Sequence, residues 1–142
     1  MRALLDINVL IALMDESHQH HSVAREWLRR NIGGGWASCP ITQNGFVRIL
    51  SQPSYSRPVP VTQAMVLLEN ATSTQHHEFW PDDISILGGA GVDRTRIHGA
   101  RQLTDTYLLA LAVRHGGRLV TFDRAIPLSA VSGAMPEHLI SL

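Results

Sequence analysis

The sequence predicts an α/β fold in which a parallel central β-sheet is flanked by α-helices. Two short apolar runs, at residues 3–5 and 118–122, have the length and composition of buried strands. Between them lie several segments whose apolar residues recur at three- and four-residue spacing, which is typical of helices. Strands that alternate with helices predict parallel pairing, because a helix then connects each strand to the next.

The start of the chain predicts one strand and two helices. Residues 3–5 suit a buried strand, and Asn8 is expected to cap a helix that continues to residue 14. Val23 and Trp27, four residues apart, share one face of a helix predicted over residues 21–31. A run of three glycines then ends this helix.

The middle of the chain predicts a second strand and two more helices. The strand is expected at residues 36–38, and a helix at residues 42–50 follows it. Three prolines predict a loop over residues 53–60, because proline interrupts both helices and sheets. Thr62 is then expected to cap a helix whose apolar residues form one narrow face.

The last part of the chain predicts a buried helix between strands. A strand is expected at residues 84–87, with a loop at residues 88–91. The helix expected over residues 105–115 is apolar on nearly every side, so it should be buried. The strand at residues 118–122 follows it, and residues 139–142 are expected to add an edge strand.

The composition of the chain limits the classes of function that it can have. The chain has 142 residues, which fits one domain over residues 1–142, with 12 acidic and 12 basic residues. The balanced charge argues against a bulk electrostatic attraction to nucleic acid, although a local basic patch stays open. The lone Cys39 excludes an internal disulfide, and no apolar stretch reaches the length of a membrane span. We therefore expect a cytoplasmic protein.

Three aspartates form the candidate site. Asp6 and Asp123 each follow a predicted strand, and ligands of open parallel sheets bind beyond the carboxyl ends of the strands. Asp105 begins the buried helix that Thr104 is expected to cap. Carboxylates gathered at one edge repel each other, and Mg²⁺ or Mn²⁺ would neutralise them.

Such a site could activate water and stabilise charge on a phosphate, which is the chemistry of phosphodiester hydrolysis. Each aspartate taken alone could equally be structural, because aspartates often end strands and cap helices. A phosphatase or receiver-like enzyme would also gather aspartates at strand ends. The absence of any lysine and of a glycine-rich phosphate loop argues against those enzymes.

Four segments of the chain resemble PIN domains, and more narrowly the VapC toxins of bacterial toxin–antitoxin pairs. These segments lie at residues 4–11, 40–48, 102–110 and 119–123, so the resemblance covers essentially the whole chain. It implies a PIN-like fold and Mg²⁺- or Mn²⁺-dependent cleavage of RNA. It also implies a homodimer and a cognate VapB-like antitoxin that covers the active site.

The resemblance also implies roles for single residues. Asp6, Asp105 and Asp123 match acidic metal ligands of the family, and Asn8 matches a polar position beside the first of them. Thr104 and Thr121 flank two of these aspartates and are expected to support the site.

One departure from the family concerns the segment Thr42-Gln43, where a glutamate usually follows the threonine. An amide can ligate a metal or hold a water molecule, but it adds no negative charge. The sequence therefore leaves two functions open. One is a working ribonuclease in which Gln43 takes part in catalysis. The other is a catalytically weak PIN domain that binds RNA or an antitoxin.

Two further groups of polar residues are weaker candidates. Arg94, Arg96 and Arg101 precede the last predicted helix and could bind RNA phosphates, although a solvated loop is an equal interpretation. The cluster of His18, His20 and His21 and the pair His76-His77 suggest zinc. No second cysteine and no His-x₃-His pair on one helix supports a closed zinc site, so a solvated entry to a helix is favoured.

Overall fold

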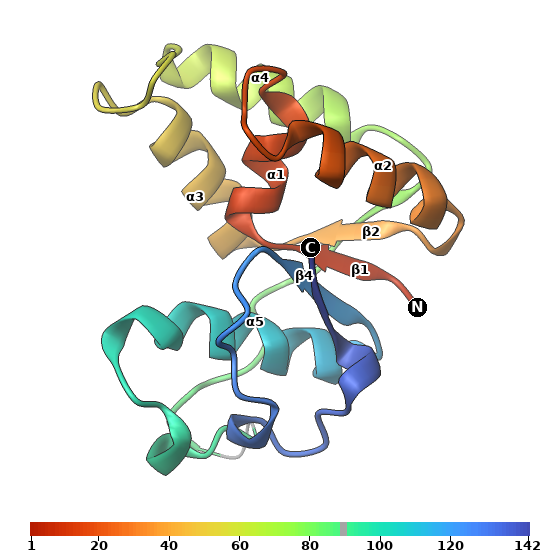
Figure 1. Ribbon diagram of the computed structural model, residues 1–142, viewed down its shortest axis with the longest axis vertical. Coiled ribbons are helices and arrows are strands. Elements are labelled where there is room, and N and C mark those ends of the chain that lie inside the picture. Colours follow the sequence, from red (N-terminus) through yellow and green to blue (C-terminus); the bar gives the residue numbers. More distant parts are fainter. Residues whose placement is uncertain (89–90) are drawn as a thin grey trace.

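A parallel β-sheet forms the centre of the structure, a computed structural model that describes residues 1–88 and 91–142 (Figure 1). Its strand order is β3-β2-β1-β4-β5, and every described pairing is parallel. The strands are β1 (Ala3–Leu5), β2 (Trp36–Ser38), β3 (His77–Phe79), β4 (Arg118–Thr121) and β5 (Leu139–Ser141). The prediction of a parallel sheet flanked by helices is confirmed.

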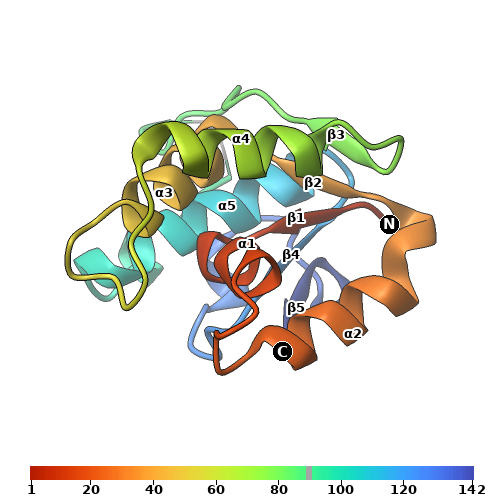
Figure 2. The same ribbon diagram turned by 90° about the horizontal axis from the view of Figure 1, so that it is seen from above.

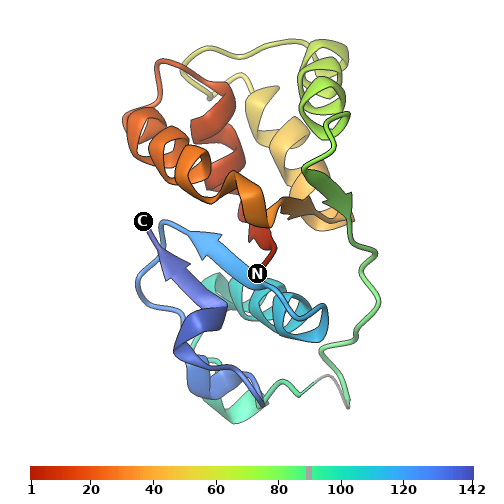
Figure 3. The ribbon, with the colours of Figure 1, turned by 90° about the vertical axis from the view of Figure 1, so that its right-hand side faces the viewer.

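The helices cover the two faces of this sheet unequally. They are α1 (Ile7–Met14), α2 (His21–Asn31), α3 (Pro40–Leu50), α4 (Val61–Thr72) and α5 (Leu103–Arg114). The first four lie on one side of the sheet, with α3 beside α4, and α5 lies on the other (Figures 1, 2 and 3). Short 3₁₀ turns accompany α5 on its side, among them η2 (Arg94–Arg96) and η3 (Ala100–Gln102).

The central strand β1 joins the two layers. Ala3 and Leu5 pack against the helices α1 to α4, whereas Leu4 packs against α5, as the two-residue period of a strand requires. All three residues are buried. Because both faces of the sheet are covered, the sequence of β1 is continuously apolar rather than alternating.

Several predicted boundaries are confirmed. The helix over residues 21–31, the strand at 36–38 and the edge strand near the carboxyl terminus all lie where the sequence places them. The face of α4 that contains Ala64 and Leu68 is buried, as predicted. No helix of the described residues is both long enough and apolar enough to span a lipid bilayer.

The three predicted helix caps are wrong. Asp6, not Asn8, caps α1, since its carboxylate accepts a hydrogen bond from the Ile7 amide and Asn8 lies inside the first turn. Pro60 stands at the cap of α4, so Thr62 is a helical residue. Thr104 is also helical, because η3 runs directly into α5 and supplies its first backbone bond.

The third strand was also predicted in the wrong place. Residues 84–87 form no strand, and β3 lies earlier in the chain, pairing with β2. Its residues, His77 to Phe79, are polar or exposed at the sheet edge and so lack the apolar pattern of a buried strand. The loop predicted at residues 88–91 falls partly outside the described residues, which exclude 89 and 90.

Candidate metal centre

The carboxyl ends of β1 and β4 bring Asp6 and Asp123 together. These strands are neighbours with Leu5 opposite Val120, so the residues that follow them emerge at the same edge. The Thr121 hydroxyl donates a hydrogen bond of 2.8 Å to Oδ2 of Asp6 and accepts one of 3.0 Å from the Asp123 amide. Thr121 therefore links the two aspartates, as its predicted supporting role requires.

The Asp6 carboxylate is held firmly. It is 6% exposed, and its Oδ1 accepts a 2.7 Å hydrogen bond from the Ile7 amide while Oδ2 is bound to Thr121. Burial raises the pKa of Asp6, the hydrogen bonds from Thr121 and Ile7 lower it, and the charge of Asp123 raises it again. The net direction is upward, and burial of the carboxylate is the largest cause.

Asp105 approaches the same edge from the first turn of α5. Its pKa is raised to about 7, first by burial, then by the charge of Asp6 and by a hydrogen bond and charge from Asp123. The structure therefore brings the three predicted aspartates together. Three carboxylates in mutual repulsion either share a proton or bind a cation.

The ligand chemistry fits a divalent cation. Among residues 1–88 and 91–142 no ion pair joins any of the three aspartates to an arginine or histidine. Nor is any group of three or more His, Cys, Asp or Glu side chains in these residues placed, as it stands, to hold a metal ion. An open, oxygen-only set is nevertheless typical of Mg²⁺, which keeps several waters and binds through one or two carboxylates.

Gln43 is not brought to this cluster. Its amide donates a 2.9 Å hydrogen bond to Oγ of Ser38 on β2, and Ser38 is in turn 2.8 Å from Nε2 of His77 on β3. Gln43 also lines a groove between α3 and α4 that none of the three aspartates lines. Its contacts therefore place it apart from the three aspartates, and its catalytic role stays a prediction.

The side of α3 nearest Asp6 presents Gly45 instead. A β-carbon at this position would lie 2.3 Å from Cδ1 of Ile7, the residue that follows Asp6, so a larger residue would displace Ile7. Asn44 and Gly45 line a cavity of about 410 Å³ together with Ile7 and Thr104. The sequence analysis missed Asn44, although its position directly after the expected glutamate site marked it as a candidate.

We expect the substitution Gln43→Glu to leave Mn²⁺ affinity within about twofold of the parent protein, since a factor of two corresponds to less than 0.5 kcal/mol. The reason is that side chain 43 points toward Ser38 rather than toward the aspartates. Titration calorimetry with Mn²⁺ on both proteins checks this. A tenfold tighter affinity in the variant would place position 43 at the metal.

The remaining predicted residues make no hydrogen bond or ion pair with the three aspartates in the described part of the chain. Asn8 is exposed in the first turn of α1, and Thr104 lies in the first turn of α5 beside the cavity described above. Arg94 and Arg96 are exposed in η2, where Arg96 lies 3.9 Å from Asp93. Arg101 is exposed in η3, the turn that leads directly into α5.

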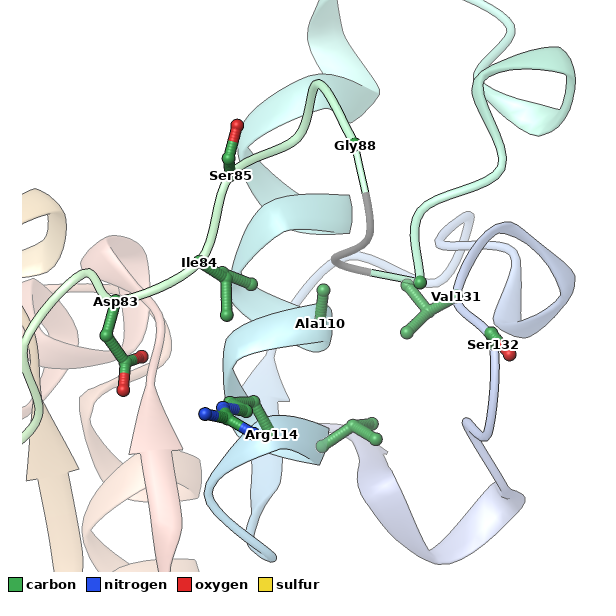
Figure 4. A pocket seen from close by; sticks show the side chains of 10 residues that line it. Asp83, Ile84, Ser85, Gly88, Ala110, Arg114, Val131 and Ser132 are labelled. Atoms are coloured by element: carbon green, nitrogen blue, oxygen red, sulfur yellow. The ribbon is translucent and has the colours of Figure 1, made fainter.

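A second cavity, of about 480 Å³, lies at the other end of α5. Ala110 and Arg114 of that helix line it together with Asp83 and Val131, as Figure 4 shows. Asp105 lies in the first turn of α5 and Arg114 ends the helix, so about nine residues of helix separate the two regions. This cavity is therefore not part of the metal centre.

The chain is similar to a known family of protein domains and to several proteins named as ribonucleases. Residues 3–132 match the family of PIN domains. The chain is 56% identical to Ribonuclease VapC44 of Mycobacterium tuberculosis over 142 residues, which is the full length of both proteins. It is 47% identical to Ribonuclease VapC39 of the same organism over 135 residues, covering 94% of this chain and 96% of that one.

A solved structure has the same fold. The crystal structure of VapBC2 from Rickettsia felis, bound to a DNA fragment from its promoter, aligns with a TM-score of 0.62. The alignment covers 87% of this chain and 89% of that one at 17% sequence identity. At this identity the likeness supports the arrangement of strands and helices only.

Proposed function

Since the chain belongs to the PIN-domain family and, within it, to the VapC ribonucleases, we propose that it is a metal-dependent endoribonuclease and the toxin of a VapBC-type pair. The observation that carries this proposal is the convergence of Asp6, Asp105 and Asp123 at one edge of the sheet. Residues 1–142 would act as one PIN domain in the cytoplasm, where RNA is available and the thiol of Cys39 stays reduced.

Asp6, Asp105 and Asp123 would hold Mg²⁺ or Mn²⁺. The bound cation supplies activation of a water molecule and stabilisation of charge on the phosphate. The chain itself contributes orientation, because Thr121 fixes the Asp6 carboxylate and the Asp123 backbone in one hydrogen-bonded chain. The Ile7 amide holds the second Asp6 oxygen, so the carboxylate cannot rotate freely.

RNA would approach the open side of the cluster. The exposed arginines Arg94, Arg96 and Arg101 lie in the two 3₁₀ turns before α5, the helix that carries Asp105. Guanidinium groups bind phosphate through paired hydrogen bonds, and such contacts position a nucleic acid without selecting its sequence. We assign to these arginines the binding of phosphates at some distance from the bond that is cleaved.

A catalytically weak module that binds RNA or an antitoxin is the second candidate function. The observation that favours it is that α3 presents Asn44 and Gly45, and no carboxylate, to the cavity beside Ile7. Helix α3 therefore adds no charged ligand to the three aspartates, and the carboxylate that does line this cavity is Asp82, which lies outside α3. Fewer carboxylates hold a hard cation less tightly, which would reduce the rate at physiological metal concentration.

Incubation with total cellular RNA tests the proposal. We expect discrete fragments with Mg²⁺ or Mn²⁺ and intact RNA with EDTA. RNA that stays intact with either metal but is retained by the protein in a filter-binding assay would support the weak module. Cleavage that EDTA leaves unchanged would contradict the metal centre.

An antitoxin would need an apolar surface, and the groove between α3 and α4 offers one. It has a volume of about 710 Å³ and is lined by Val47, Val61, Met65 and Leu68. Val61 is 54% exposed and Met65 is 56% exposed, which is high for large apolar side chains. We propose that the antitoxin binds here and not directly over the active site, where the family resemblance would place it, and that a homodimer forms through another face.

The substitution Met65→Glu is expected to weaken antitoxin binding by about tenfold or more, because a charge in an apolar interface must be desolvated without a partner. Cleavage of RNA by the free toxin should not change, since Met65 lies outside the metal centre. Met135, which is 52% exposed in a different segment, provides the matched control Met135→Glu. Equal losses in both variants would contradict the assignment of the groove.

A further inference from the structure

Three aromatic side chains form a cluster beside the metal centre, which we call the aromatic platform and define as His18, His20 and Phe122. The His20 and Phe122 ring centroids are 4.7 Å apart with the planes 32° from parallel. His18 lies nearly parallel to Phe122, at 15° and 6.4 Å, and 5.7 Å from His20. Two loops that are far apart in the sequence thus meet at one aromatic surface.

The loop that carries the histidines is ordered by its own hydrogen bonds. The His20 amide donates a 3.0 Å hydrogen bond to Nδ1 of His18, and the His18 amide donates one of 3.0 Å to the carbonyl of Asp15. The ring of His21 is 2.7 Å from the carbonyl of Ala12 in α1, which ties the start of α2 to the helix before it. The platform is therefore formed before any ligand arrives.

The platform lies directly beside the proposed site of cleavage. Phe122 stands between Thr121, which binds Asp6, and Asp123. The α-carbon of Phe122 is about 3.8 Å from that of Asp123, so the platform is joined directly to a residue of the metal centre. Phe122 itself is half-buried against the core of α1 and α2, whereas His20 is exposed.

Aromatic rings in this position suit a flat, unpaired ligand. Bases of single-stranded RNA stack on phenylalanine, tyrosine, tryptophan and histidine, and such stacking tolerates any base. A metal is a poorer occupant, because only His18 and His20 of the platform can ligate one, fewer than the three or four protein ligands of typical zinc sites. A folded protein surface would need a wider apolar area than one exposed imidazole offers.

We propose that His18, His20 and Phe122 form a stacking site for the unpaired base of a nucleotide that flanks the scissile phosphate, with His20 making the direct contact. The proposal rests on the proposed ribonuclease function and adds to it a substrate-binding element. The substrate would then be single-stranded at this position, in a loop or an open end, since a paired base cannot reach the platform.

The test begins with a short RNA whose cleavage position has been mapped from its products. In one substrate set, the base on either side of the scissile phosphate is removed to leave an abasic ribose. We expect one of these abasic substrates to lose about tenfold in kcat/KM, within the range that base stacking contributes. His20→Ala should lose a similar factor on intact RNA, mainly through KM, and lose nothing further on that abasic substrate.

Two variants separate stacking from other roles. His20→Phe keeps an aromatic ring and should restore most of the activity that His20→Ala loses. Gln19→Ala changes an exposed, non-aromatic residue of the same loop and should leave the kinetics unchanged. If the factors lost in kcat/KM through His20→Ala and through the abasic substrate multiply when the two are combined, His20 does not contact that base and the proposal is overturned.

A binding measurement under conditions that prevent cleavage tests the stacking proposal separately from the proposed ribonuclease function. In EDTA, 2-aminopurine in place of the flanking base should be quenched on binding to the parent and to His20→Phe, and not to His20→Ala. Quenching without any metal-dependent cleavage would overturn the ribonuclease and keep the platform. If the parent cleaves RNA but the parent and His20→Ala quench 2-aminopurine equally, only the stacking proposal is overturned. A loss of antitoxin binding in His20→Ala with unchanged RNA kinetics would also overturn the stacking proposal alone.

Discussion

The substitution Asp6→Asn is expected to reduce metal-dependent RNA cleavage by about 10³-fold, because removing one preorganised electrostatic group from an active site typically costs about 10²–10³ in rate. Asparagine is a favourable helix cap and can still accept the hydrogen bond from Ile7. The loss should therefore come from the missing charge and not from misfolding. Cleavage of a defined RNA, measured at saturating Mn²⁺, checks the prediction.

A control for Asp6→Asn is Asp83→Asn. Asp83 is an exposed aspartate that pairs with His115, 3.1 Å away, at the opposite end of α5 from Asp105. This variant should retain the activity of the parent, because its charge lies outside the metal centre. If Asp6→Asn cleaved RNA at the rate of Asp83→Asn, the assignment of Asp6 as a metal ligand would be wrong.

The substitution Asp105→Asn is expected to abolish cleavage and at the same time to stabilise the metal-free protein. The pKa of Asp105 in the folded protein is about 7, whereas an unfolded aspartate titrates near 4. Between these values the folded chain binds more protons than the unfolded chain, so stability falls as pH rises from about 4 to about 7. A neutral asparagine does not ionise, so it removes this loss of folding stability at high pH.

Thermal unfolding in EDTA measures the expected gain in stability of the metal-free Asp105→Asn variant. At pH 8 the variant should unfold about 2–4 °C above the parent, a typical response of a domain of this size to about 1 kcal/mol. At pH 4.5 the difference should nearly vanish, because Asp105 is then protonated in the folded parent. Mn²⁺ should raise the unfolding temperature of the parent at pH 8 and have little effect on the variant. A variant that is less stable than the parent at pH 8 would contradict the repulsion among the three carboxylates.

The positions of Asp6 and Asp123 could be predicted from the sequence because they depend on a short-range rule. A buried apolar run predicts a strand, parallel strands end at one edge, and β1 and β4 are neighbours as that argument requires. The prediction that Asp105 belongs to the site depended on the family resemblance, because nothing in its own segment specifies which edge of the sheet the helix faces. The three now lie together in the structure.

The position of Gln43 away from the aspartates has a geometric cause. Successive residues on a helix turn by about 100°, so positions 43 and 45 face directions about 200° apart. The sequence pattern predicts that α3 exists, but the face it turns to the site depends on its packing against α1 and β2. That packing directs Gln43 to Ser38 and leaves Gly45 against Ile7.

The missed strand β3 has a different cause. Edge strands are often short and polar, and His77 to Phe79 satisfy only the hydrogen bonds of one neighbour. Such a segment carries no apolar period from which it could be recognised. The aromatic platform could not be predicted either, because His20 and Phe122 are about a hundred residues apart in sequence and meet only in the folded chain.

Titration calorimetry with Mn²⁺ at pH 6.5, repeated in buffers of different ionisation enthalpy, tests the central claim most directly. If the three aspartates hold the cation, binding must displace the proton that Asp105 carries at this pH, because a carboxylate ligates a metal only when deprotonated. We expect the parent to release close to one proton for each ion bound at pH 6.5 and almost none at pH 8.5, and we expect Asp105→Asn to bind weakly. Tight Mn²⁺ binding that releases no proton at pH 6.5, or that is equally tight in Asp105→Asn, would contradict the metal centre.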